Sequence, residues 1–182
     1  MRSLLLTAVL LTRSFASAGG ASPALPGQVF ERTATGTLYT GKAGNGIDFK
    51  VWFTPAGHAP RLLLDPQRTF PRPQTSLAMG ATLGQGQTVY ILVQHAYNHN
   101  DSDQIIYSVN RLTHVPVKVI AMSALKLHLA LGEVFRYDAA RDRLIFSAIR
   151  PERDASGQVG SVQHLYSYGP LQRSVRTLLR QP

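Results

Sequence analysis

One concentrated group of polar side chains in this chain has the chemistry to recognise another molecule. It lies between two apolar runs, Val89–Val93 and Gln104–Val109, and combines amide, imidazole, hydroxyl and carboxylate groups. It runs from His95 to Asp103, and the residues expected to contact a partner are Tyr97, Asn98, His99, Asn100, Asp101, Ser102 and Asp103. Because functional residues concentrate in loops carried by rigid strands, we expect a partner-binding surface here. The alternative is a solvated strand connection whose Asn and Asp side chains bond the local backbone.

The loop has some features of a calcium-binding loop, but it does not complete the pattern. Asn98, Asn100 and Ser102 alternate as calcium ligands do. The turn glycine is missing, and Val109 stands at the twelfth position, where a bidentate glutamate closes such a loop. The sequence therefore does not support a calcium site.

A non-haem iron site is the alternative metal hypothesis. His99 and Asp101, with the distant His164, supply the two histidines and one carboxylate that hold iron on one face and leave positions open for oxygen. With Arg173 further on, this set resembles the site of 2-oxoglutarate-dependent oxygenases. The resemblance implies iron bound by His99, Asp101 and His164, and a co-substrate carboxylate bound by Arg173.

Other catalytic chemistry finds little support in the sequence. The chain has no cysteine, which excludes a thiol nucleophile, a disulfide and a cysteine metal site. It also lacks the nucleophile elbow, the phosphate-binding loop and the zinc-protease helix motif. We therefore expect a protein that is not an enzyme and that carries no cofactor.

The segments that must position the polar loop have the pattern of strands. Short runs rich in Val, Ile, Tyr and Phe alternate with turn residues along the chain. This spacing predicts an all-β fold made of repeated strand-turn-strand units, forming a small propeller-like or sandwich domain. The segment Ser123–Leu131 is ambiguous between helix and strand, and the alternation of its leucines favours a half-buried strand.

Three of these units are similar to one another. Lys50–Leu64, Ile106–Ile120 and Leu165–Leu179 each consist of a strand, a polar turn and a second strand with an apolar end. His58 and His114 occupy equivalent turn positions, which predicts a structural role for both. With a further strand upstream, the pattern resembles the blades of β-propellers. The alternatives are a compact arrangement of three sheets, a sandwich, a curved sheet, or hairpins that share only hairpin chemistry.

The beginning of the chain predicts export. Residues 1–18 have the pattern of a signal peptide, with an apolar run after Arg2 and a small-residue cleavage site at Ala18. Residues 19–28 are small and uncharged, as in a flexible leader, and residues 29–182 are expected to form a single all-β domain. The localisation that we expect is periplasmic or secreted. No later segment is apolar enough for a membrane helix, so no stable membrane insertion is expected.

The net charge is positive. Cleavage after Ala18 removes Arg2 and Arg13 and no acidic residue, which lowers the formal charge from +9 to +7. The basic residues are scattered, and export makes nucleic acid an unexpected partner. Attraction to an anionic envelope polymer or to an acidic protein remains an alternative interpretation of the charge.

Together, the signal peptide, the repeated hairpins and the polar loop resemble periplasmic immunity proteins that neutralise peptidoglycan amidases delivered by type VI secretion. The resemblance covers chiefly Leu83–Ile120. It implies that a serine on the loop enters the amidase cleft and contacts the catalytic histidine, and Ser102 stands at the matching position. The hypothesis is therefore an exported, non-enzymatic binding protein that inhibits a cell-wall hydrolase by loop insertion. The alternatives are the iron oxygenase and a structural protein that binds peptidoglycan or the envelope.

Overall fold

Three antiparallel sheets make up the fold in the computed structural model. The structure describes residues 26–43, 46–129, 134–153 and 157–180. The N-terminal sheet contains β1 (Pro26–Thr33), β2 (Gly36–Ala43), β3 (Gly46–Pro55) and β4 (Arg61–Leu64). The central sheet contains β5 (Thr75–Leu83), β6 (Thr88–Ala96), β7 (Ser102–Asn110) and β8 (Pro116–Ala121). The C-terminal sheet contains β10 (Phe135–Asp138), β11 (Arg143–Arg153), β12 (Val159–Gly169) and β13 (Ser174–Arg180), and the short β9 (His128–Leu129) pairs with β11.

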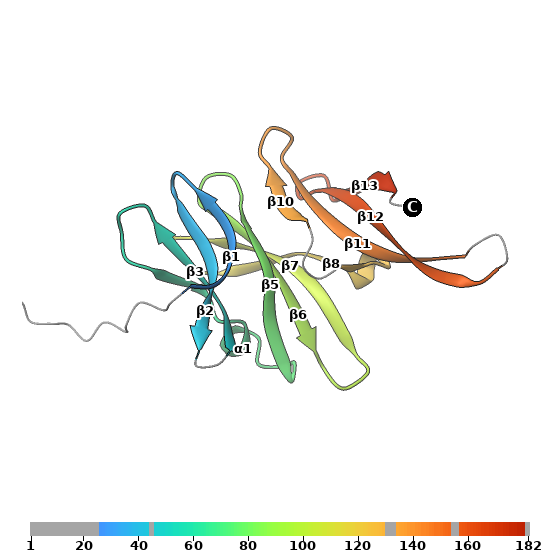
Figure 1. The fold of residues 1–182 in the computed structure, drawn as a ribbon, viewed down its shortest axis with the longest axis horizontal. Coiled ribbons are helices and arrows are strands. Elements are labelled where there is room, and N and C mark those ends of the chain that lie inside the picture. Colours follow the sequence, from blue (N-terminus) through green and yellow to red (C-terminus); the bar gives the residue numbers. More distant parts are fainter. Residues whose placement is uncertain (1–25, 44–45, 130–133, 154–156, 181–182) are drawn as a thin grey trace, which may run out of the picture.

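Each sheet follows the order of the sequence, so every main strand pairs with the strand before or after it. None of the three sheets closes on itself within the described residues, and the central sheet lies between the other two (Figure 1). The predicted all-β fold is confirmed, and its form is a layered, sandwich-like domain. The longest α-helix among the described residues is α1 (Pro66–Thr69), with four residues, and no described helix is long and apolar enough to cross a membrane.

The three predicted repeat units occupy equivalent places. Lys50–Leu64 lies on β3 and β4, Ile106–Ile120 on β7 and β8, and Leu165–Leu179 on β12 and β13, so each unit is the last hairpin of its sheet. His58 and His114 both hydrogen-bond to a backbone carbonyl within their own turn. This geometry agrees with the structural role expected for the two histidines.

The central sheet is buried on both faces. Along β6, Val89, Ile91 and Val93 belong to a core shared with the N-terminal sheet, whereas Tyr90 and Leu92 belong to a core shared with the C-terminal sheet. Successive side chains of a strand point to opposite faces, so a continuous apolar run suits a strand covered on both sides. This explains why residues 89–93 are apolar without interruption.

A hydrogen-bonded chain at the edge strand β5 links all three sheets. Glu31 of β1 accepts, through Oε2, the Thr82 hydroxyl at 2.9 Å and the Leu83 backbone N–H at 2.7 Å. The same Thr82 Oγ1 accepts the backbone N–H of Tyr137, on β10, at 3.1 Å. Thr82 is buried, so loss of its hydroxyl leaves polar groups without partners inside the structure.

Two local predictions need correction. The strand expected over Ser123–Leu131 is instead a 3-10 turn at Ser123–Leu125, and the chain then turns through Lys126 at a φ of 54° before β9. The first strand begins at Pro26 rather than Val29, and it therefore includes the end of the segment 19–28 that was expected to be a leader. The predicted signal peptide at residues 1–18, with its cleavage site at Ala18, lies outside the described residues.

Replacing Thr82 by valine should destabilise the fold by about 1–3 kcal/mol, because the Tyr137 N–H loses its acceptor and Glu31 loses a donor in a buried place. Thr177→Val, at an exposed position of β13, is the matched control and should change stability by no more than about 0.5 kcal/mol. Urea unfolding measures both free energies. Equal stability of the two variants would contradict a linking role for Thr82.

Candidate functional site

The predicted contact residues lie at the turn between β6 and β7, which reaches beyond the ends of the neighbouring sheets on that side (Figure 1). Tyr97 donates its backbone N–H to the Asp101 carbonyl at 2.8 Å, and the Asn98 side chain accepts the Asn100 N–H at 2.9 Å. Residues 97–102 are exposed. The turn therefore has its own hydrogen bonds, while its side chains remain accessible.

Beneath this turn, His95 holds three strands together. Its ring Nδ1 lies 2.9 Å from Ser76 Oγ on β5, and its Nε2 lies 3.0 Å from the Tyr107 hydroxyl on β7. The side chain is only 2 % exposed, and this burial lowers the pKa of His95. A neutral imidazole donates from one ring nitrogen and accepts at the other, so both ring nitrogens of His95 are hydrogen-bonded here.

An aromatic pocket opens beside His95. It has a volume of about 360 Å³ and is lined by residues 69–73, His95, Tyr97 and Tyr107. The Phe70 ring stacks on Tyr107 with centroids 4.6 Å apart and meets His95 edge-on at 4.9 Å. Burial raises the pKa of Tyr107 to about 12, so its hydroxyl stays protonated and available for hydrogen bonding. We call this cavity the Phe70 pocket.

On its other side, the hairpin is fastened by Asp103. The Asp103 carboxylate accepts the Ser123 hydroxyl at 2.7 Å and the Ser123 backbone N–H at 3.2 Å, which ties β7 to the 3-10 turn after β8. Ser102 and Asp103 also line a smaller pocket, of about 200 Å³, together with Gln94, Gln104 and His128. The Asp103 carboxylate thus serves as an anchor, while Ser102 remains exposed beside the turn.

The seven predicted residues consequently divide into three groups. Tyr97 borders the Phe70 pocket, residues 98–101 form the tip of the turn, and Ser102 and Asp103 border the smaller pocket. One hairpin therefore carries all seven residues, and two pockets border it.

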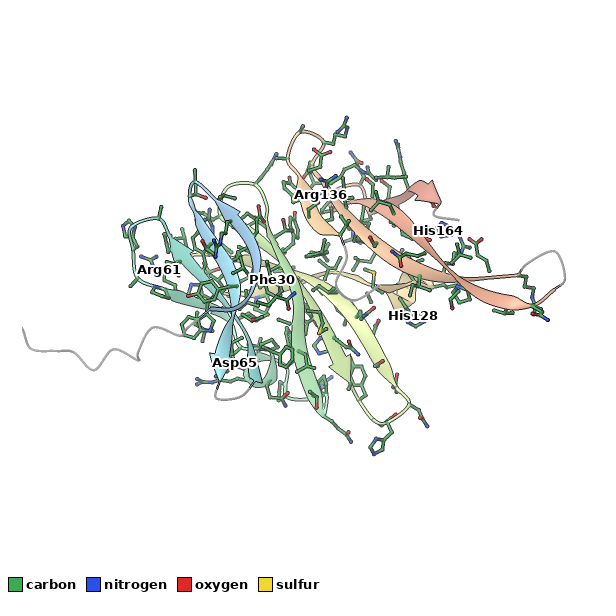
Figure 2. The ribbon with its side chains drawn as sticks, in the orientation of Figure 1. Phe30, Arg61, Asp65, His128, Arg136 and His164 are labelled. Atoms are coloured by element: carbon green, nitrogen blue, oxygen red, sulfur yellow. The ribbon has the colours of Figure 1, made fainter. Side chains whose placement is uncertain are left out.

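The residues of the alternative iron site are not brought together. His99 and Asp101 lie in the β6–β7 turn, whereas His164 lies on β12 of the C-terminal sheet (Figure 2). There the His164 Nε2 is 2.9 Å from Glu152 Oε1, and the side chain is buried. Among the residues that the structure describes, no three His, Asp or Glu side chains gather as metal ligands would. The predicted set of His99, Asp101 and His164 was therefore wrong as a site.

Three residues of this site, His95, Tyr107 and Phe70, were not among the predicted contact residues, although His95 begins the polar segment. His95 continues the series of Val89, Ile91 and Val93 at every second position, which signals a polar side chain directed into a core. Tyr107 likewise belongs to the series of Ile105 and Val109, at every second position of β7, whose side chains enter the same core. Phe70 approaches from the segment between α1 and β5, and no sequence pattern indicates this contact.

The stability of the protein should fall as the pH is lowered from about 7 to about 5. The pKa of His95 is lower in the folded protein than in the unfolded chain, so below about pH 6.5 the unfolded state binds the proton more readily. This contribution cannot exceed about 1.4 kcal/mol per pH unit. Urea unfolding at both pH values should show a weaker pH dependence for His95→Gln than for the wild type.

His58→Gln is the control for this experiment, because His58 is an exposed histidine in the β3–β4 turn. It should leave the pH dependence of stability unchanged. A His95→Gln variant that loses stability with falling pH as steeply as the wild type would show that His95 is not the group responsible.

Comparison of the chain with protein-family models, with curated proteins and with solved structures gives no match.

Proposed function

We propose that this protein is a non-enzymatic binding protein that presents the β6–β7 turn to a protein partner. The observation that carries the proposal is the way the hairpin is held. His95 fastens its base on one side and Asp103 on the other, while residues 97–102 remain exposed. A surface already fixed in its binding shape loses less conformational entropy on association, which favours affinity.

The side chains of the turn suit a protein surface. Tyr97 is 39 % exposed and combines an apolar ring with a hydroxyl, a type of side chain that often anchors interfaces. Asn98, Asn100 and Asp101 add exposed donors and acceptors around it. An aromatic anchor surrounded by polar groups is the usual composition of a specific protein interface.

As the class of partner, we propose a cell-wall hydrolase, with this protein as its immunity-type inhibitor. Support comes from the resemblance of Leu83–Ile120 to periplasmic immunity proteins and from the export signal expected in residues 1–18. In this proposal the turn enters the hydrolase cleft, with Ser102 among the contact residues. Ser102 is the first residue of β7 and is exposed, so a cleft that admits the tip also reaches it.

The test places a large side chain at this position. Ser102→Trp should weaken partner binding at least tenfold, about 1.4 kcal/mol, because the indole prevents the turn from seating in the cleft. The mature protein, tagged at its C-terminus, is first used to capture its partner from envelope and secreted fractions. Mass spectrometry then identifies the partner. The affinity of the purified pair and the rate at which the partner digests peptidoglycan are then measured with each variant.

Thr113→Trp is the matched control, since Thr113 is exposed in the turn at the opposite end of β7. It should bind and inhibit like the wild type. If Ser102→Trp binds the partner as tightly as the wild type does, the hairpin is not the contact surface. Salt-sensitive binding to peptidoglycan, insensitive to both variants, would favour an envelope-binding protein instead.

A further inference from the structure

We infer that the Phe70 pocket is a subsite for an aromatic side chain that stands next to a carboxylate on the partner. The inference rests on the proposed function, because the partner supplies this side chain while its cleft receives the β6–β7 turn. Tyr97 belongs both to the turn and to the pocket wall, so the two contacts are continuous.

The walls of the pocket suit a ring. Phe70, Tyr97 and Tyr107 contribute aromatic surface, and Pro71 and Pro73 complete the lining. Aromatic rings attract one another in stacked and edge-on arrangements, as Phe70 already does with Tyr107 and His95. The volume of about 360 Å³ falls in the range of about 300–1,000 Å³ that is typical of ligand sites.

The pocket is also held in shape before any ligand arrives. Gln67 of α1 accepts the Ser76 backbone N–H at 3.0 Å and donates to the Gln74 carbonyl at 3.3 Å. These bonds clamp the Phe70–Pro73 segment against the start of β5, and its two prolines restrict the backbone further. The opposite wall is fixed by the hydrogen bonds of His95. A ligand therefore meets a preformed site.

One charged side chain of the pocket wall suits an anion. Arg72 lines the pocket, is exposed, and forms no ion pair within the described part of the chain. At His95 the Asp103 carboxylate, which raises the pKa, outweighs Lys118, which lowers it, so the positive charge offered to a ligand is that of Arg72. Because a guanidinium binds a carboxylate through two parallel hydrogen bonds, the Arg72 side chain is suited to a carboxylate beside the bound ring.

The test uses small probes in place of the partner. N-acetyl-L-phenylalanine carries a ring and a carboxylate, N-acetyl-L-phenylalaninamide lacks the charge, and N-acetylglycine lacks the ring. In a titration followed by amide NMR, the first should shift the signals of Phe70, Arg72, Tyr97 and Tyr107. The uncharged probe should bind several-fold more weakly, and N-acetylglycine should give no shifts there.

Two variants separate the ring from the charge. Arg72→Gln should abolish the preference for the charged probe, while both ring-bearing probes still bind weakly. Tyr97→Ser should weaken the binding of both ring-bearing probes. Arg61→Gln, which removes an exposed arginine on β4, is the control and should bind like the wild type (Figure 2). Absence of shifts at the pocket, or equal binding of all three probes, would overturn the inference. If the amide signals of the pocket residues change with protein concentration when no probe is present, a second copy of the chain fills the pocket, and the inference is wrong as well.

Measurements of partner binding by the same variants separate a failure of this inference from a failure of the proposed function. If Ser102→Trp weakens partner binding but Arg72→Gln does not, the hairpin is the contact surface and the subsite is wrong. If Ser102→Trp has no effect, the proposed function fails, whatever the probes show.

Discussion

The burial of the central sheet on both faces is the constraint on which the rest of the structure depends. Val89, Ile91 and Val93 point into one core, and Tyr90 and Leu92 point into the other. A shift of one residue in the register of β6 would exchange these two sets, so both cores fix the same pairing. The exposed turn is therefore carried by a strand whose pairing both cores fix.

Polar contacts complete this arrangement where the apolar cores end. Thr82 joins the three sheets at the edge of β5, and His95 joins β5, β6 and β7 beneath the turn. Both side chains are buried, so the free energy gained from their hydrogen bonds depends on every partner being in place. The geometry of the Phe70 pocket is consequently coupled to the packing of the central sheet.

The sequence predicted the strands well because hairpins are local structures, and the three repeat units proved to be equivalent. It left a compact arrangement of three sheets open as an alternative, but it could not predict which sheet covers which face of β6, since contacts between sheets join distant residues. The alternating leucines after Ser123 were misleading, because Lys126 adopts a left-handed conformation and turns the chain. Residues 97–103 were predicted as contact residues from their polar composition and their place between two strands, and this assignment stays a prediction. Phe70 was not predicted, because its contact with Tyr107 spans separate segments of the fold.

Hydrogen exchange of the backbone amides, with and without the partner, shows whether the doubly covered central sheet holds the turn for binding. The amides of β6 and β7 should exchange among the slowest in the free protein, because the central sheet opens only when both cores open. The partner should add protection at residues 97–103 and at the Phe70 pocket. New protection confined to the C-terminal sheet, with the β6–β7 turn unchanged, would contradict a role of the turn in binding.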